Sequence, residues 1–200
     1  MKEWLELKYP KQVILGIDEA GRGPLAGPCI VCGVILPVDY THPLINDSKK
    51  LSPKQRGMCF NDIMRDALWI NIVAVNPSTI DSLNIYQATK RANFIIINQS
   101  MADCALTDAM PIKQAKIPVY DFIKGDQRSI TIAAASIIAK VTRDTIMESY
   151  DIIYPQYGFK QHKGYPTKQH REALLKYGIC PIHRLSYEPV RSLAKISLFK

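Results

Sequence analysis

The architecture follows from one segment, Val13-Ile-Leu-Gly-Ile-Asp-Glu-Ala-Gly-Arg-Gly-Pro-Leu-Ala-Gly-Pro28, and from the apolar run Ile30-Val-Cys-Gly-Val-Ile-Leu36 behind it. The apolar, β-branched residues at both ends favour strands. The glycines and prolines between them favour a tight loop. We therefore predict two strands, 13–17 and 30–36, joined by a short connection.

Further elements follow outward from this pair. The patterns predict strands at 70–75, 104–107 and 117–123, and helices at 53–68, 77–101, 129–150 and 167–177. The first turns of the 129–150 helix, Ile130 to Ala139, are apolar on every side, which indicates a buried helix. Residues 154–166 are expected to form an irregular connection, and the 167–177 helix to be the last one. Strands that come first and then alternate with helices predict an α/β sheet covered by helices.

Length and charge suggest one folding unit with a basic end. The chain has 200 residues, and its 47% hydrophobic and 22% charged residues exclude disordered, collagenous and coiled-coil proteins. Residues 151–200 hold 9 Lys and Arg against 3 Asp and Glu, out of a net charge of +8. We predict a core over 1–150 and a basic helical segment over 151–200, packed together as one unit. The basic segment fits either a polyanion-binding face or a solvated surface.

The apolar stretches and the cysteines indicate the cellular compartment of the protein. No apolar stretch approaches the roughly 20 residues that a membrane span needs, so we expect a cytoplasmic protein without a membrane partner. The five cysteines are an odd number set among apolar neighbours, which suits a reducing compartment. Cys29-x-x-Cys32 could suggest zinc or redox chemistry, but no second pair follows at zinc spacing, so buried filler is favoured.

Carboxylates stand at the predicted ends of elements. Asp18 and Glu19 end the first strand, Asp108 follows strand 104–107, and Asp126 precedes the buried helix. A solvated turn or a helix-start acid would explain each one singly. Together, four such carboxylates could hold two divalent ions about 4 Å apart, an arrangement that hydrolyses phosphodiesters. Asp103, on the other side of strand 104–107, is the alternative third acid.

The same loop offers a rival interpretation. Gly21-x-Gly23-x-x-Ala26 formally matches the dinucleotide-binding fingerprint. Two acids immediately before the loop would repel a pyrophosphate, and the pattern after it is a strand where the fingerprint needs a helix. A nicotinamide- or flavin-dependent oxidoreductase is therefore disfavoured.

Five motifs in order resemble the ribonuclease HII family, over residues 12 to 190. They are Gly16-Ile-Asp-Glu-Ala-Gly-Arg-Gly-Pro-Leu-Ala-Gly-Pro28, Asn46-Asp-Ser-Lys-Lys-Leu-Ser52, Lys124-Gly-Asp126, Ile132-Ala-Ala-Ala-Ser-Ile-Ile-Ala-Lys-Val-Thr-Arg-Asp144 and His162-Lys-Gly-Tyr-Pro-Thr167. The resemblance implies an RNase H-like mixed sheet flanked by helices, with a C-terminal helical extension. It implies a monomeric endoribonuclease that uses Mg²⁺ or Mn²⁺. The implied substrates are RNA–DNA hybrids and DNA duplexes with single ribonucleotides, cut on the 5′ side to leave 3′-hydroxyl and 5′-phosphate ends.

The resemblance also assigns roles. The metal-binding carboxylates fall on Asp18, Glu19, Asp108 and Asp126, and the loop Gly21-Arg22-Gly23 and Tyr165 would recognise the ribose 2′-hydroxyl. Lys49 and Lys163 are candidates for phosphate contacts, with solvated lysines as the alternative. Asp144 could support the metal site or pair with a neighbour on its own helix. A non-catalytic nucleic-acid-binding module remains the competing function.

Overall fold

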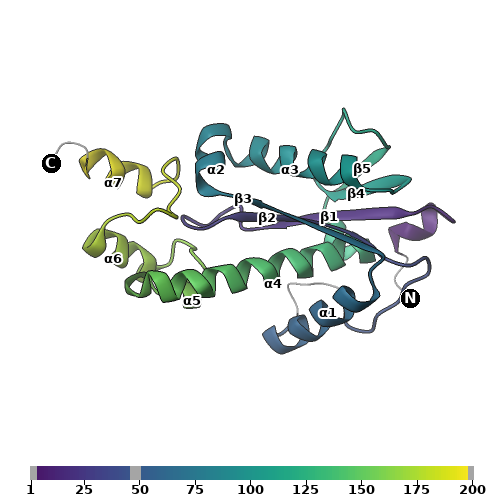
Figure 1. The fold of residues 1–200 in the computed structure, drawn as a ribbon, viewed down its shortest axis with the longest axis horizontal. Coiled ribbons are helices and arrows are strands. Elements are labelled where there is room, and N and C mark those ends of the chain that lie inside the picture. The colour runs from purple at the N-terminus through teal and green to yellow at the C-terminus, as the bar shows by residue number, and fades with distance from the viewer. Residues whose placement is uncertain (1–3, 46–50, 198–200) are drawn as a thin grey trace.

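A five-stranded mixed sheet organises the chain in a computed structural model that describes residues 4–45 and 51–197. In spatial order its strands are β3 (Trp69–Val75), β2 (Cys29–Ile35), β1 (Ile14–Ala20), β4 (Cys104–Asp108) and β5 (Val119–Phe122) (Figure 1). β1, β2 and β3 pair antiparallel, whereas β4 and β5 run parallel to β1. The predicted mixed α/β sheet is confirmed.

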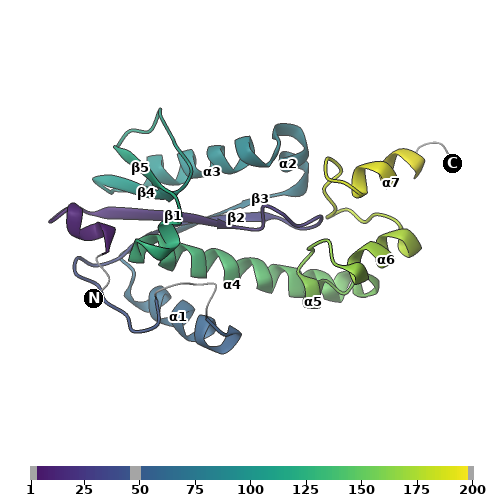
Figure 2. The same ribbon diagram turned by 180° about the vertical axis from the view of Figure 1, so that it is seen from behind.

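Helices cover both faces of this sheet. They are α1 (Pro53–Asp66), α2 (Pro77–Leu83), α3 (Ile85–Gln99), α4 (Ile130–Ile153), α5 (Phe159–His162), α6 (Lys168–Tyr177) and α7 (Val190–Ser197), with short 3₁₀ turns η1 (Leu5–Lys8), η2 (Gly125–Gln127) and η3 (Pro155–Tyr157). α2 and α3 lie on one face, and α4 and α1 lie on the other (Figures 1 and 2). Within the described ranges, none of the helices has the length and apolar character needed to cross a membrane.

Strand β2, which lies between β3 and β1, is buried on both faces. Cys29, Val31 and Ile35 pack into the apolar cluster under α2 and α3, while Ile30, Cys32 and Val34 pack toward α1 and α4. Successive side chains of a strand point to opposite faces. Cys29 and Cys32 are therefore free, fully buried thiols on different faces of the sheet, and the favoured interpretation as filler is confirmed.

The long helix α4 lies directly against β1. Its first ten residues are all buried, as predicted. A Cβ at Gly16 would stand 2.2 Å from the carbonyl carbon of Thr131, so only glycine allows the helix backbone to approach the strand this closely. Further along the same pair, Gly21 adjoins Arg143, so α4 runs beside β1 in the same direction.

Helices begin where the sequence provides capping residues. Ser52 and Gln55 form the capping box of α1, with Pro53 in its first turn. The 77–101 segment divides into α2 and α3 at Asn84, whose φ of 64° interrupts the helix and whose side chain caps α3.

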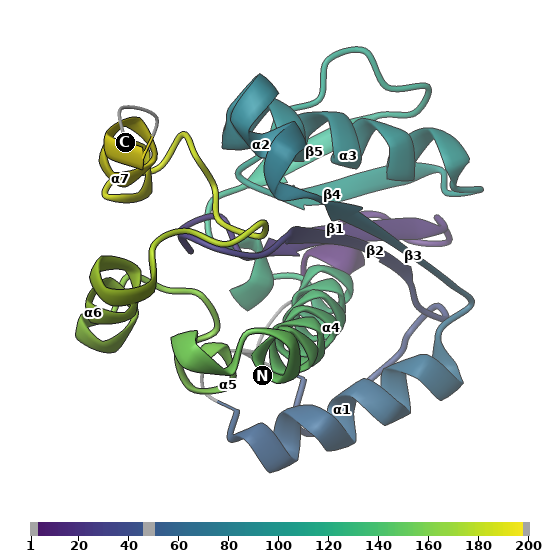
Figure 3. The same ribbon diagram turned by 60° about the vertical axis from the view of Figure 1, so that its left-hand side comes forward.

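The C-terminal segment departs from the prediction in two places. Residues 154–166 are not an irregular connection, since they contain η3 and α5, and α6 is followed by a further helix, α7. η3 and α5 are too short to show a helical period in sequence, whereas α7 does show one, with apolar residues at Val190, Leu193 and Ala194. An apolar cluster joins Leu25, Ala26 and Met147 to C-terminal residues such as Phe159 and Leu174. Figure 3 turns this segment toward the viewer, and it lies beside the end of α4.

Candidate functional site

Asp18 and Asp108 lie next to each other at the carboxyl ends of two parallel strands. The last registered pair of β1 and β4 is Ile17 with Thr107, so the aspartates that follow are neighbours. Asp108 Oδ1 accepts a hydrogen bond of 2.9 Å from Gly125 N–H, which holds η2 against the end of β4. Asp126 follows Gly125 within η2 and is buried.

Glu19 leaves the strand on the other face from Asp18. β1 continues through both residues and ends at Ala20, so their side chains alternate as in any strand. Asp18 is buried against α4, where Ser136 hydrogen-bonds to it, and its Oδ1 accepts from Glu19 N–H at 2.8 Å. Glu19 Oε1 lies 3.4 Å from Nη1 of the exposed Arg22.

Negative charge is concentrated around Asp18. Burial, and next the charge of Glu19, raise the pKa of Asp18 well above its ordinary value, and Asp108 adds to the effect. The hydrogen bonds from Ser136 and the backbone only partly oppose this rise. A carboxyl group in this environment is costly to ionise, and a divalent cation would relieve that cost.

The donor set fits a hard cation that is only partly enclosed by protein. Among residues 4–45 and 51–197, no three His, Cys, Asp or Glu side chains are gathered closely enough to form a metal cage. Mg²⁺ keeps several waters and commonly uses one or two carboxylates together with substrate phosphates. Carboxylates at an open sheet end suit that mode of binding, in which the substrate completes the site.

Two other acids lie outside this group. Asp103 is at the opposite end of β4, where its Oδ2 accepts a 2.7 Å hydrogen bond from Val13 N–H. Asp144 forms an ion pair of 2.8 Å with Lys140, one turn earlier on α4. The structure thus favours Asp108 over Asp103 as the neighbour of Asp18, and it gives Asp144 the pairing expected of a helix-surface residue.

The loop after β1 meets Tyr165. A Cβ at Gly23 would stand 3.8 Å from Cε1 of Tyr165, so the two residues are side by side. Tyr165 is 42% exposed. Arg22 and Gly23 are exposed as well. Lys163 Nζ forms a 2.7 Å ion pair with Glu148 Oε1. Lys49 lies outside the described residues.

Two buried arginines beneath this loop were not predicted. Arg143 and Arg184 are 1% and 0% exposed, and both donate to backbone carbonyl groups of residues 21–28. Burial, and next the Arg184 charge, lower the pKa of Arg143 to about 10. Arg143 continues the spacing of Ile132, Ser136 and Ala139 on α4, and this position on the buried face was the signal available in the sequence.

Three buried histidines lie beneath Tyr165. His170 Nδ1 donates to Tyr165 O at 3.0 Å, and its Nε2 lies 3.0 Å from His183 Nε2. His183 Nδ1 accepts from Cys180 N–H at 2.9 Å, so its Nε2 carries the proton given to His170. His162 accepts from Gly164 N–H and donates to Tyr157 O. Each ring is held as a neutral imidazole.

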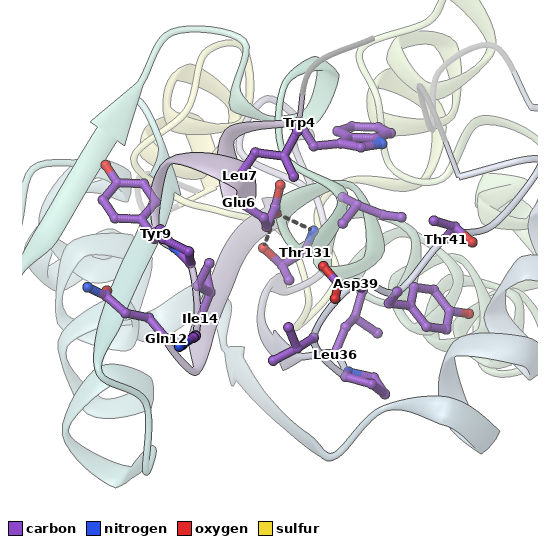
Figure 4. Close-up of a pocket in the computed structure, with 16 residues that line it drawn as sticks. Trp4, Glu6, Leu7, Tyr9, Gln12, Ile14, Leu36, Asp39, Thr41 and Thr131 are labelled. Carbon is purple, nitrogen blue, oxygen red and sulfur yellow. Dashed lines mark hydrogen bonds between the residues drawn. The ribbon is translucent and has the colours of Figure 1, made fainter. Parts of the chain in front are cut away.

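A separate pocket of about 370 Å³ lies toward the start of β1 (Figure 4). Within it, Glu6 Oε1 accepts from the N–H and hydroxyl of Thr131 at 3.1 and 2.8 Å. The carboxylate therefore caps the first turn of α4, where the helix dipole favours negative charge. Ile14 and Leu36 supply apolar wall, and none of the four candidate carboxylates lines this pocket.

Known proteins match this chain over most of its length. The Ribonuclease HII family profile matches residues 15–190. Ribonuclease HII of Enterococcus faecalis is 49% identical over 96% of this chain and 77% of its own, and that of Acholeplasma laidlawii is 52% identical over 91% and 90%.

Solved structures agree with this assignment. Ribonuclease H2 from Pyrococcus horikoshii superposes with a TM-score of 0.80 at 26% identity, covering 94% of this chain and 99% of that one. The ribonuclease HII of Archaeoglobus fulgidus, solved in complex with PCNA, gives a TM-score of 0.77 at 26% identity over 88% and 95%. β2 follows the glycine loop where a dinucleotide fingerprint would require a helix, so the oxidoreductase alternative is excluded. The chain belongs to the ribonuclease HII family of metal-dependent endoribonucleases, which act on RNA–DNA hybrids.

Proposed function

We propose that this chain incises nucleic acid on the 5′ side of a ribonucleotide, both in RNA–DNA hybrids and at single ribonucleotides within DNA duplexes. Asp18, Asp108 and Asp126 would hold two divalent ions, Mg²⁺ or Mn²⁺, and Glu19, which leaves β1 on the other face, would have to turn from Arg22 to complete the set. The products would carry 3′-hydroxyl and 5′-phosphate ends. The observation that carries the proposal is the position of Asp18, whose buried carboxyl group adjoins Asp108 and lies three residues before the loop that meets Tyr165.

Bound divalent ions would supply the Lewis acidity that activates water and stabilises the leaving oxygen. The chain's own groups position the substrate. Gly23 and Tyr165 form an exposed contact where a ribose and its base could lie, with Tyr165 stacking on the sugar and base. Gly21 keeps its backbone at a φ of 102°, which a side chain would disfavour, so the loop can approach the ribose closely.

The basic C-terminal segment would hold the duplex through phosphate contacts. Lys163 and Lys49 are the candidate residues for these contacts. In the free protein Lys163 is bound to Glu148, so a phosphate would have to compete with that carboxylate. We further propose that the enzyme acts as a monomer in the cytoplasm.

The decisive experiment uses a labelled DNA duplex with one ribonucleotide, incubated with Mg²⁺, Mn²⁺ or EDTA, beside an all-DNA duplex. The Asp18→Asn variant tests the site, and Asp103→Asn is its matched control, because Asp103 lies at the other end of β4. We expect metal-dependent incision 5′ of the ribonucleotide by the wild type and the control variant, and no incision by Asp18→Asn.

Two results would count against the proposal. Binding without incision under every metal condition would leave only a nucleic-acid-binding module. Incision that survives Asp18→Asn but is lost in Asp103→Asn would move the active site to the opposite end of the sheet.

A further inference from the structure

The loop of residues 21–28 is clamped by a distant part of the chain. Ala26 forms an antiparallel bridge with His183, Arg184 N–H donates to Leu25 O at 2.8 Å, and Gly27 N–H donates to Ile182 O at 2.8 Å. The segment 182–184 therefore lies against the loop as a short added strand. This pairing places the side chain of Arg184 directly behind the loop.

The side chain of Arg184 donates its hydrogen bonds to carbonyl groups of the loop. Its Nη2 donates to Gly21 O at 2.6 Å and to Gly27 O at 2.9 Å, and its Nη1 donates to Arg22 O at 2.9 Å. Tyr187 Oη donates to the same Arg22 oxygen at 2.7 Å. A buried guanidinium is expensive unless it is hydrogen-bonded. This one binds main-chain oxygens of a single loop, so its effect is to fix that loop.

The direction of these bonds determines where the loop's donors point. In a trans peptide the C=O and the following N–H point to opposite sides. Because Arg184 holds the carbonyl groups of Gly21 and Arg22 inward, the N–H groups of Arg22 and Gly23 point away from it, on the exposed side of the loop. Within the described ranges, neither N–H donates a hydrogen bond to another residue. Two oriented donors are thus presented beside Tyr165.

We propose that Arg184 is a positioning residue for ribonucleotide recognition: it fixes the peptide groups of Gly21 and Arg22 so that the next two N–H groups face the ribose. This inference rests on the proposed function, in which Gly21-Arg22-Gly23 and Tyr165 recognise the 2′-hydroxyl. Tyr187 assists by binding the Arg22 carbonyl. Arg184 itself does not touch the substrate.

The test measures how strongly the protein prefers a duplex with one ribonucleotide over an all-DNA duplex, in addition to its activity. Binding of a DNA duplex with one ribonucleotide and of the matched all-DNA duplex is compared in EDTA for the wild type and for Arg184→Lys. Lysine keeps the charge but lacks the planar fork of donors that spans the Gly21, Arg22 and Gly27 carbonyl groups. We expect the preference for the ribonucleotide duplex to fall about tenfold, the size of one charged hydrogen bond, while affinity for all-DNA is unchanged. Steady-state incision with Mg²⁺ should show a higher KM together with a lower kcat.

Two further variants keep the test interpretable. Tyr187→Phe removes the hydrogen bond to Arg22 O and keeps the ring that lies against Arg184. It should therefore lower the preference by a smaller factor than Arg184→Lys, and it can be read even if Arg184→Lys does not fold. Arg191→Lys, an exposed arginine on α7, is the matched control and should leave the preference unchanged.

The outcomes separate this inference from the proposed function. If the wild type binds both duplexes equally, the proposed recognition itself is wrong, and the inference falls with it. If the wild type prefers the ribonucleotide and both Tyr187→Phe and any folded Arg184→Lys retain that preference, the positioning role alone is overturned.

Discussion

The neutral histidines beneath Tyr165 should make the folded protein sensitive to mild acid. Burial, as the largest cause, lowers the pKa of both His170 and His183 to about 4 from an ordinary 6.5. The folded state therefore binds protons less readily than the unfolded chain. The contribution of these neutral histidines to the free energy of unfolding is fully present above about pH 6.5 and is lost as the pH falls toward 4.

The magnitude follows from these pKa values. At pH 5 an unfolded histidine is almost wholly protonated and a folded one with a pKa near 4 is mostly neutral, a difference of about 2 kcal/mol per ring. Protonation of His170 at Nε2, which accepts the bond from His183 Nε2 at 3.0 Å, would also break the bond between the rings. We expect the pair to reduce the free energy of unfolding by about 2 to 4 kcal/mol between pH 7.5 and 5.

Urea unfolding of the wild type and of His183→Asn at the two pH values measures this loss. The variant should lose about 2 kcal/mol less than the wild type on acidification, whatever its stability at pH 7.5. Leu174→Ala is the matched control, because it weakens the same C-terminal apolar cluster without removing a titrating group. Equal losses in the wild type and His183→Asn would refute the reasoning.

Three further predictions concern the core and the site. Asp18→Asn should unfold at a higher temperature than the wild type in EDTA near pH 8, because its raised pKa makes the ionised carboxylate destabilising there; equal melting temperatures would argue against a strained carboxyl group. Gly16→Ala should cost roughly 1–3 kcal/mol in urea unfolding because its Cβ meets the α4 backbone. Gly57→Ala, inside α1 with nothing within 4 Å, should instead stabilise by about 0.5–1 kcal/mol; no loss in Gly16→Ala would show that α4 yields easily. Glu6→Ala should cost about 1–2 kcal/mol in the same assay by uncapping α4, and an unchanged stability would mean that Ser129 alone suffices as the cap.

The predictable parts of the fold were those with local signals. Apolar, β-branched runs located β1 and β2, and the Ser52-Pro53 start and the all-apolar turns of α4 located two helices. The placement of Asp108 also followed from its position after a short strand. These features depend on periodicity and capping, which a sequence displays directly.

The unpredicted parts depend on contacts between distant residues. Arg184 looks like any basic residue of the C-terminal segment until the bridge between Ala26 and His183 places it behind the loop. The neutral histidines are similar, since only folding brings His170 within 3.0 Å of His183. A four-residue helix such as α5 owes its stability to tertiary packing, which leaves no periodic signal in the sequence.

If the proposed function holds, helix α4 sets a fixed spacing between the carboxylates and the loop that would recognise the ribose. Ser136, which bonds to Asp18, and Arg143, which lies behind Gly21, are seven residues apart on one helix. Seven residues make two turns, so both face the same side at a separation of about 10 Å. In the proposed function, this one helix would therefore fix the distance from the ribose to the scissile bond, and every substrate should be cut at the same nucleotide offset.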